Sequence, residues 1–149
     1  MHTREDPIYH GDIKSLNILL DRDLSAKLCD FGTARRRSDQ NSAINGTMSW
    51  LAPEILIDSV VNNDRTDAYS FGMLLYELLT DRTPYEGCAK LEVLGKICEG
   101  EPPVLIENIG ADYELIELMR ECTKRDPSER PSMRDVVLKL KKIKRNKHY

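Results

Sequence analysis

The sequence lacks the features that would assign it to a membrane, secreted or nucleic-acid-binding class. Its longest apolar stretch, around residues 71–79, contains Gly72 and Glu77 and is much shorter than a transmembrane helix requires. The N-terminus has no apolar stretch of signal-peptide length. The formal net charge is −3, so no excess of positive charge favours nucleic acid. We therefore expect no transmembrane segment, no nucleic-acid partner and a cytoplasmic location.

Cysteine is also scarce and has no metal-binding pattern. None of the four cysteines forms a C-x-x-C pair, and the three histidines are not spaced with them as zinc ligands. The pattern predicts free thiols in a reducing compartment.

What the sequence does contain is enough apolar residues for one domain of 149 residues, and helical periodicity dominates after Pro53. Pro53 suits the first turn of a short helix at 54–57. Longer helices are expected at 67–80, 90–98 and 113–124. The first of these is apolar nearly all round and should be central and buried.

A fourth long helix should begin at Ser132, where Asp135 three residues later resembles a capping box. We expect four of its side chains to face the core: Val136, Val137, Leu140 and Ile143.

The first 30 residues differ from this helical part. Apolar runs at 17–20 and 26–28 flank a turn and predict a β-hairpin, and the polar stretch 33–46 predicts an exposed loop. The predicted fold class is therefore mainly α: a helical lobe with a small β element at its N-terminal end.

Three motifs carry recognisable chemistry, and two later motifs reinforce them. The three are His10-Gly-Asp-Ile-Lys-Ser-Leu-Asn17, Asp30-Phe-Gly32 and Gly46-Thr-Met-Ser-Trp-Leu-Ala-Pro-Glu54. The others are Asp67-Ala-Tyr-Ser-Phe-Gly72 and Cys122-Thr-Lys-Arg-Asp-Pro-Ser-Glu-Arg-Pro131. In this order and spacing they closely resemble the C-terminal lobe (C-lobe) of eukaryotic protein kinases.

The resemblance implies a division of residues 1–149 into a catalytic loop (10–17), an activation segment (30–54) and a helical subdomain (55–147). The run Lys-Ser-Leu-Asn-Ile-Leu-Leu, starting at Lys14, looks most like the tyrosine-kinase-like branch of Ser/Thr kinases. Lys14 and Thr47 also resemble the residues that Ser/Thr kinases carry at these two places of the motifs. The implied reaction is Mg²⁺-dependent transfer of the ATP γ-phosphoryl group to a Ser or Thr hydroxyl of a protein substrate.

The resemblance also implies roles for individual residues. Asp12 would orient or accept the proton of the substrate hydroxyl, and Lys14 would neutralise charge on the phosphoryl group. Asn17 and Asp30 would bind Mg²⁺ through hard oxygen atoms. Thr47 would contact Asp12 and Lys14.

Further contacts follow from the same resemblance. Leu19 would lie beneath the adenine ring of ATP, with Ile18 and Leu20 directed into the lobe; ordinary strand core is the alternative for all three. His10 would stack on Phe31 and be anchored by Asp67. Glu54 and Arg130 would form a buried ion pair.

Gly11 departs from the family, because most kinases have Arg at this place. That Arg pairs with a phosphate on the activation segment. We therefore expect that phosphorylation of Ser38, Ser42 or Thr47 is not the main switch, and that Gly11 loosens the loop.

A larger departure is that the N-terminal lobe (N-lobe) is absent: the sequence has no Gly-x-Gly-x-x-Gly loop and no Val-Ala-x-Lys strand. We expect the chain to be a fragment, with Met1 an internal methionine, that is inactive without an N-lobe or another binding partner.

Two alternatives to a kinase lobe remain open. One is a catalytically silent, pseudokinase-like module that binds proteins, and the other is an unrelated helical domain with chance motifs. The basic residues within 139–147 are read as the solvated end of a helix, in preference to a membrane-binding or nuclear signal.

Overall fold

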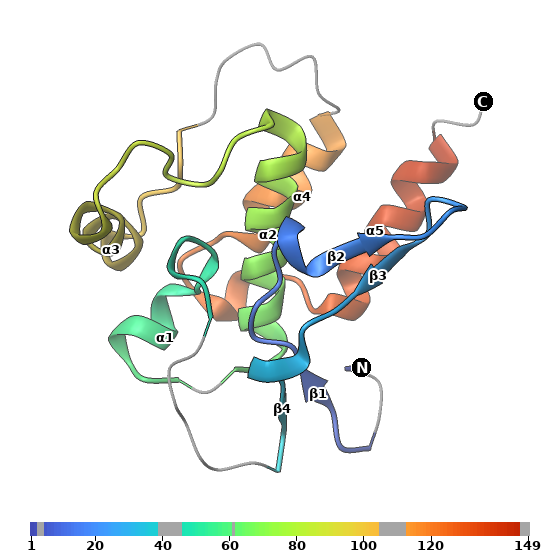
Figure 1. Cartoon of the computed structure of the whole chain (residues 1–149), viewed down its shortest axis with the longest axis horizontal. Helices are drawn as coiled ribbons and strands as arrows, with labels where there is room; N and C mark the ends of the chain where they lie inside the picture. Colours follow the sequence, from blue (N-terminus) through green and yellow to red (C-terminus); the bar gives the residue numbers. More distant parts are fainter. Residues whose placement is uncertain (3–4, 39–45, 61, 105–112, 147–149) are drawn as a thin grey trace.

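The computed structural model describes residues 1–2, 5–38, 46–60, 62–104 and 113–146 (Figure 1). Ser42, and Lys147 at the end of the basic stretch 139–147, lie outside these residues. The described helices are α1 (Pro53–Ile57), α2 (Asp64–Thr80), α3 (Lys90–Glu99), α4 (Tyr113–Cys122) and α5 (Met133–Asn146). The described strands are β1 (Ile8–Tyr9), β2 (Ile18–Leu20), β3 (Ala26–Leu28) and β4 (Arg35–Arg36). The mainly α prediction is confirmed. Among the described helices, none has the length and apolarity that a membrane crossing needs.

Helix α2 runs through the middle of the molecule (Figure 1). It begins three residues earlier than predicted, because Asn63 caps it. The Asn63 side chain accepts hydrogen bonds from the backbone N–H groups of Arg65 and Thr66, and the Thr66 hydroxyl accepts one from the backbone N–H of Asn63. The apolar stripe used for the prediction starts later than this cap. As predicted, most of the helix is buried.

Two apolar clusters pack on different parts of α2. Tyr69 and Met73 pack with the segment Trp50–Ile55 and with α3. Leu75 and Tyr76 pack with α4 and α5. Burial in the second cluster raises the pKa of Cys122 to about 12, and all four cysteines are free. Because α2 is packed on both sides, groups that it carries are held firmly.

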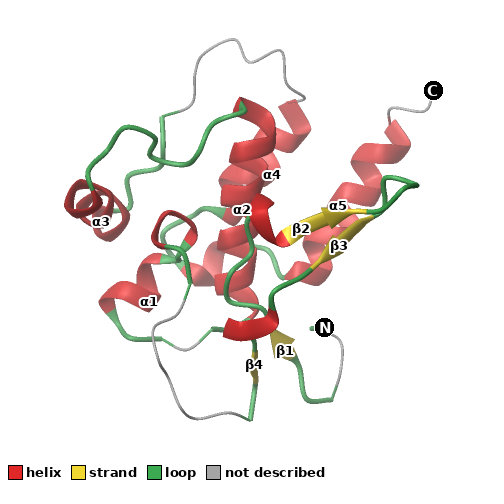
Figure 2. Ribbon diagram, in the orientation of Figure 1, coloured by secondary structure: helices red, strands yellow, loops and turns green. Residues whose placement is uncertain are grey.

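Two short, two-stranded antiparallel sheets lie beside the helices, and the β2–β3 sheet is a hairpin (Figure 2). Strands β2 and β3 pair with Ile18 opposite Leu28 and Leu20 opposite Ala26, as the apolar runs predicted. Strands β1 and β4 pair Tyr9 with Arg35, which was not predicted. The prediction that Leu20 faces into the lobe was wrong, because its side chain is 62% exposed near the hairpin tip.

Helix α5 has the predicted capping box: the Ser132 hydroxyl accepts from the Asp135 N–H, and the Asp135 carboxylate accepts from the Ser132 N–H. Val136 and Ile143 are buried as expected. Val137 was assigned wrongly to the core and is 46% exposed. Together with Leu28 of β3 and Leu138 it lines a largely apolar cavity of about 430 Å³.

The Glu54–Arg130 ion pair is buried and bidentate. Arg130 Nη1 and Nη2 lie 2.7 and 2.9 Å from the two Glu54 oxygens. The remaining guanidinium N–H groups donate to the backbone carbonyls of Lys124, Arg65 and Arg125. All five donors of Arg130 are therefore satisfied, which only a planar guanidinium achieves at one position.

The burial of this ion pair predicts a large effect on stability. Replacing Arg130 with Met leaves the buried Glu54 carboxylate and three backbone carbonyl groups without their hydrogen-bond donor. We expect Arg130→Met to lower the free energy of unfolding by about 3–5 kcal/mol, measured by urea denaturation.

A matched control removes one partner of an exposed pair, Arg120–Glu117 on α4. Glu117→Gln should cost less than about 1 kcal/mol. Equal losses in the two variants would contradict the importance given to the buried pair.

Candidate active site

The start of the 10–17 loop is fixed on α2 by one buried carboxylate. Asp67 accepts hydrogen bonds from the backbone N–H groups of His10 (2.8 Å) and Gly11 (2.9 Å). The side chain of His2 adds a third contact to Asp67, at 2.9 Å from Nε2. These contacts attach the loop to the most buried helix of the fold.

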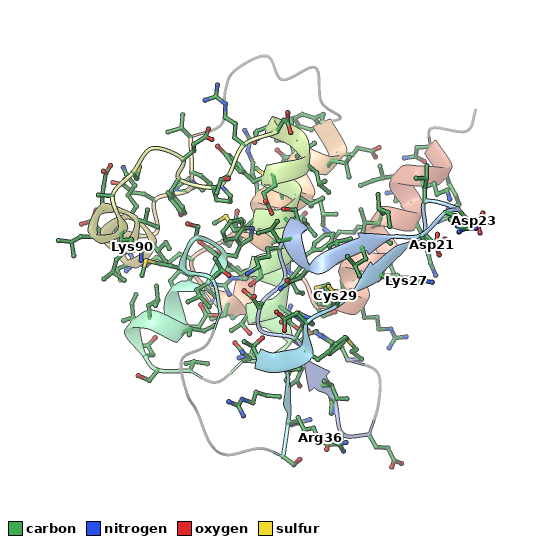
Figure 3. The ribbon with its side chains drawn as sticks, in the orientation of Figure 1. Asp21, Asp23, Lys27, Cys29, Arg36 and Lys90 are labelled. Atoms are coloured by element: carbon green, nitrogen blue, oxygen red, sulfur yellow. The ribbon has the colours of Figure 1, made fainter. Side chains whose placement is uncertain are left out.

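His10 then connects this loop to the end of β3. Its Nε2 lies 2.9 Å from the carbonyl oxygen of Cys29, and its ring meets Phe31 edge-on at a centroid distance of 5.1 Å. A carbonyl only accepts, so Nε2 carries the proton and Nδ1 accepts from the Asp12 N–H. Figure 3 shows Cys29 at the end of β3, and Asp30 is the next residue in the sequence.

Asp12 is the centre of a saturated hydrogen-bond cluster. Its Oδ1 accepts from the backbone N–H and the hydroxyl of Thr47, at 2.9 and 2.8 Å. Its Oδ2 accepts from Lys14 Nζ (2.8 Å) and Asn17 Nδ2 (3.0 Å). Lys14 Nζ also donates to the Thr47 hydroxyl at 2.5 Å. Four of the predicted site residues therefore meet at one point.

The donors set the charge of this carboxylate. Burial raises the pKa of Asp12, but the hydrogen bonds from Lys14 and Thr47 outweigh burial and hold the pKa below its ordinary value. Asp12 is consequently an anion at neutral pH, and protonating it requires breaking these bonds.

Asn17 contacts Asp12 through its amide nitrogen and not through its amide oxygen. Its Nδ2 donates to the backbone carbonyl of Asp12 at 2.7 Å as well as to the Asp12 carboxylate. This orientation leaves Oδ1 without a hydrogen-bond donor among the described residues. The Asn17 backbone carbonyl also accepts from the Cys29 N–H at 2.9 Å, which places the residue before Asp30 against the loop.

Asp30 follows Cys29, whose N–H is bonded to the Asn17 carbonyl, and makes no hydrogen bond to the Asp12 cluster. Its backbone has φ 57° and ψ 75°, a left-handed conformation that among residues other than glycine is adopted mainly by Asn and Asp. One carboxylate oxygen accepts from the Gly32 N–H at 3.3 Å, and the side chain is exposed. Leu19, the other predicted site residue, is 57% exposed on β2 and does not join the cluster.

The sequence interpretation missed three residues at this site: His2, Asn62 and Glu77. His2 and Asn62 have no recognisable local signal. Glu77 did have one, because it is a carboxylate within an otherwise apolar helical stretch. Its contacts are described below.

Asn62 explains the unusual Gly11. Gly11 has φ +78°, and a Cβ atom there would lie 2.0 Å from Asn62 Nδ2 and 3.2 Å from the Thr33 carbonyl oxygen. The residue is buried, and its N–H is bonded to Asp67. We expected Gly11 to loosen the loop, but the structure shows it held closely between two other segments.

The profile of the family described as "Protein tyrosine and serine/threonine kinase" matches residues 2–140. The chain belongs to this protein kinase family. It is also 37% identical to a protein of Acanthamoeba polyphaga mimivirus that is named as a serine/threonine-protein kinase/receptor, over 94% of this chain. Two further similar proteins are the RGS domain-containing serine/threonine-protein kinase A of Dictyostelium discoideum (34% identity over 91% of the chain) and the calcium/calmodulin-regulated receptor-like kinase 1 of Arabidopsis thaliana (34% over 95%).

This kinase chain spans only a small part of those relatives: 8% of the mimivirus protein, 12% of the Dictyostelium protein and 35% of the Arabidopsis protein. The similarity therefore shows the family, and the expected resemblance is confirmed.

The geometry of the 10–17 loop predicts that the stability of the fold depends on glycine at position 11. Gly11→Ala should lower the free energy of unfolding by about 1–3 kcal/mol, because it adds left-handed strain and a steric conflict with Asn62. Urea denaturation measures the loss. Adding Asn62→Ala should recover part of it.

Gly95 in α3 is the matched control, since no atom lies within 4 Å of a Cβ placed there. Gly95→Ala should stabilise the chain by about 0.5–1 kcal/mol. A neutral Gly11→Ala would show that the loop does not need its observed conformation.

His2 predicts a pH dependence of stability. Burial lowers the pKa of His2, but its contacts to Asp64 (2.5 Å) and Asp67 outweigh burial and raise the pKa from 6.5 to about 9. Protonated His2 therefore stabilises the fold fully below pH 6.5, and this contribution is lost as the pH rises through about 9.

We expect the urea midpoint to fall across this interval, with Tyr9 and Arg37 as the other ionisable groups nearby. His2→Asn should flatten the decline. An identical decline in His2→Asn and in the wild-type chain would assign it to another group.

Proposed function

We propose that this chain acts as the catalytic lobe of a Mg²⁺-dependent protein serine/threonine kinase, which transfers the ATP γ-phosphoryl group to Ser or Thr hydroxyls of a protein substrate. The observation that carries the proposal is the cluster in which Asp12 meets Lys14, Asn17 and Thr47. The names of the relatives support the choice of Ser and Thr.

Asp12 would orient the substrate hydroxyl rather than remove its proton early. Its lowered pKa makes it a weak base, so the proton would move to Asp12 late in the reaction. By then the bond from the hydroxyl oxygen to phosphorus is forming and the bond from phosphorus to the ADP oxygen is breaking. A late proton transfer fits a loose phosphoryl-transfer transition state.

The cluster must also open to admit a substrate. A carboxylate has about four lone-pair sites, and the donors from Lys14, Asn17 and Thr47 use all four. A substrate hydroxyl would therefore displace the Thr47 hydroxyl or Lys14 from Asp12. Displaced Lys14 would be free to neutralise the phosphoryl group.

The residues present fit a Mg²⁺ ion together with ATP. Asn17 Oδ1 and one carboxylate oxygen of Asp30 are hard acceptors that no donor of the described residues uses. Bound Mg²⁺ would neutralise phosphate charge. The described residues contain no group of three or more His, Cys, Asp or Glu side chains that could hold a metal ion. The remaining ligands would therefore be phosphate oxygens and water, as is usual for Mg²⁺.

We further propose the division into catalytic loop 10–17, activation segment 30–54 and helical subdomain 55–147, with Leu19 beneath the adenine ring. Leu19 and Phe31 are 57% and 51% exposed, and Phe31 directly follows Asp30, so apolar side chains are uncovered on β2 and beside Asp30. An N-lobe would cover such a surface. This exposure also favours a second candidate function, a catalytically silent module that binds a protein partner there.

The test is transfer of radiolabelled phosphate from ATP to Ser/Thr peptides. The chain is assayed alone and as a fusion in which the N-lobe of a serine/threonine kinase relative precedes it. We expect Mg²⁺-dependent labelling of Ser or Thr in the fusion, with kcat reduced at least about 100-fold by Asp12→Asn or Asp30→Ala.

Asp23→Asn is the matched control, since Asp23 lies at the exposed hairpin tip (Figure 3). It should leave kcat unchanged. Labelling that survives Asp30→Ala would reject the proposed metal ligand. A folded fusion that transfers no phosphate would favour the silent binding module.

A further inference from the structure

Glu77 joins two segments that meet at the Asp12 cluster. Its Oε1 accepts from the Ser15 hydroxyl at 2.6 Å. Its Oε2 accepts from the Ser15 backbone N–H at 3.1 Å and from the indole N–H of Trp50 at 2.9 Å. One carboxylate on α2 thus receives three donors from two parts of the chain.

These two parts are the ones that the Asp12 cluster connects. Ser15 directly follows Lys14, and Trp50 lies three residues after Thr47. Trp50 is also tied to α2 by the Ser70 hydroxyl, which donates to its carbonyl at 2.8 Å. The loop and the end of the 30–54 segment are therefore bridged twice, once through Asp12 and once through Glu77.

We propose that Glu77 is a positioning residue that sets the spacing between the catalytic loop and the end of the activation segment. Its importance for catalysis rests on the proposed kinase function. Helix α2 is buried on both sides, so the Glu77 carboxylate gives both segments one rigid reference point. Displacement of Trp50 from Glu77 would then loosen the contact of Thr47 with Asp12.

A carboxylate suits this position because it only accepts, so it satisfies all three donors together. A glutamine oxygen could accept from the Ser15 N–H and the Trp50 indole, but its N–H₂ group would face the Ser15 hydroxyl, which would then have to accept instead of donating. Glu77→Gln therefore replaces charge-assisted hydrogen bonds with weaker neutral ones, with almost no change in side-chain size.

Trp50 is the only tryptophan of the chain, so its indole N–H gives a single NMR signal. The experiment measures this signal and the hydrogen exchange of the Thr47 amide, which donates to Asp12, in the 149-residue chain. In Glu77→Gln we expect the indole signal to shift and Thr47 to exchange about tenfold faster or more. Amides within α4, such as Leu118, should keep their exchange rates.

Two further variants keep the test decisive. Ser15→Ala removes a single hydroxyl. It should shift the Trp50 indole signal in the same direction as Glu77→Gln does, and it should accelerate hydrogen exchange of the Thr47 amide by less. Glu86→Gln, at an exposed loop position, is the control and should change neither signal.

The proposal is overturned if Glu77→Gln leaves the Thr47 amide unchanged. It is also overturned if α4 amides accelerate as much as Thr47 in both Glu77→Gln and Ser15→Ala, because Glu77 would then only stabilise the whole fold. In a fusion that transfers phosphate, Glu77→Gln should lower kcat with little effect on the KM for ATP. A fusion without any activity would reject the kinase function and leave the exchange result standing.

Discussion

The hydrogen bonds from the His10 and Gly11 backbone to the buried Asp67 carboxylate are the constraint on which the site depends. Asp12 lies two residues after His10, so its position is fixed relative to α2. His2 adds a cationic partner that offsets the cost of burying the Asp67 charge. Without this anchor, the loop would have no fixed relation to Thr47.

Helix α2 combines structural and functional roles on different faces. Its apolar faces pack against α3, α4 and α5. Asp67, Ser70 and Glu77 recur at spacings that place them on one side of a helix, and each contacts the loop or the end of the 30–54 segment. The same helix therefore organises the core and aligns the two segments that carry the site residues.

Local sequence signals predicted the β2–β3 hairpin, the helices and the Ser132 cap, because each depends on neighbouring residues. The motifs also indicated which residues would surround Asp12. The exposure of Leu20 and Val137 was not predictable, since periodicity identifies an apolar face without saying what covers it. Contacts between distant segments, such as Asn62 against Gly11 and Glu77 with Trp50, leave no periodic pattern.

The proposed catalytic role depends above all on Asn17 and Asp30 holding the metal ion of a bound nucleotide beside Asp12. Paramagnetic broadening of NMR signals by Mn²⁺ and ATP tests this most directly. We predict that the Asn17 side-chain amide and the Asp30 backbone amide broaden first, and that Asp30→Ala removes the effect. Broadening that begins elsewhere, or that is unchanged by Asp30→Ala, would contradict this metal site.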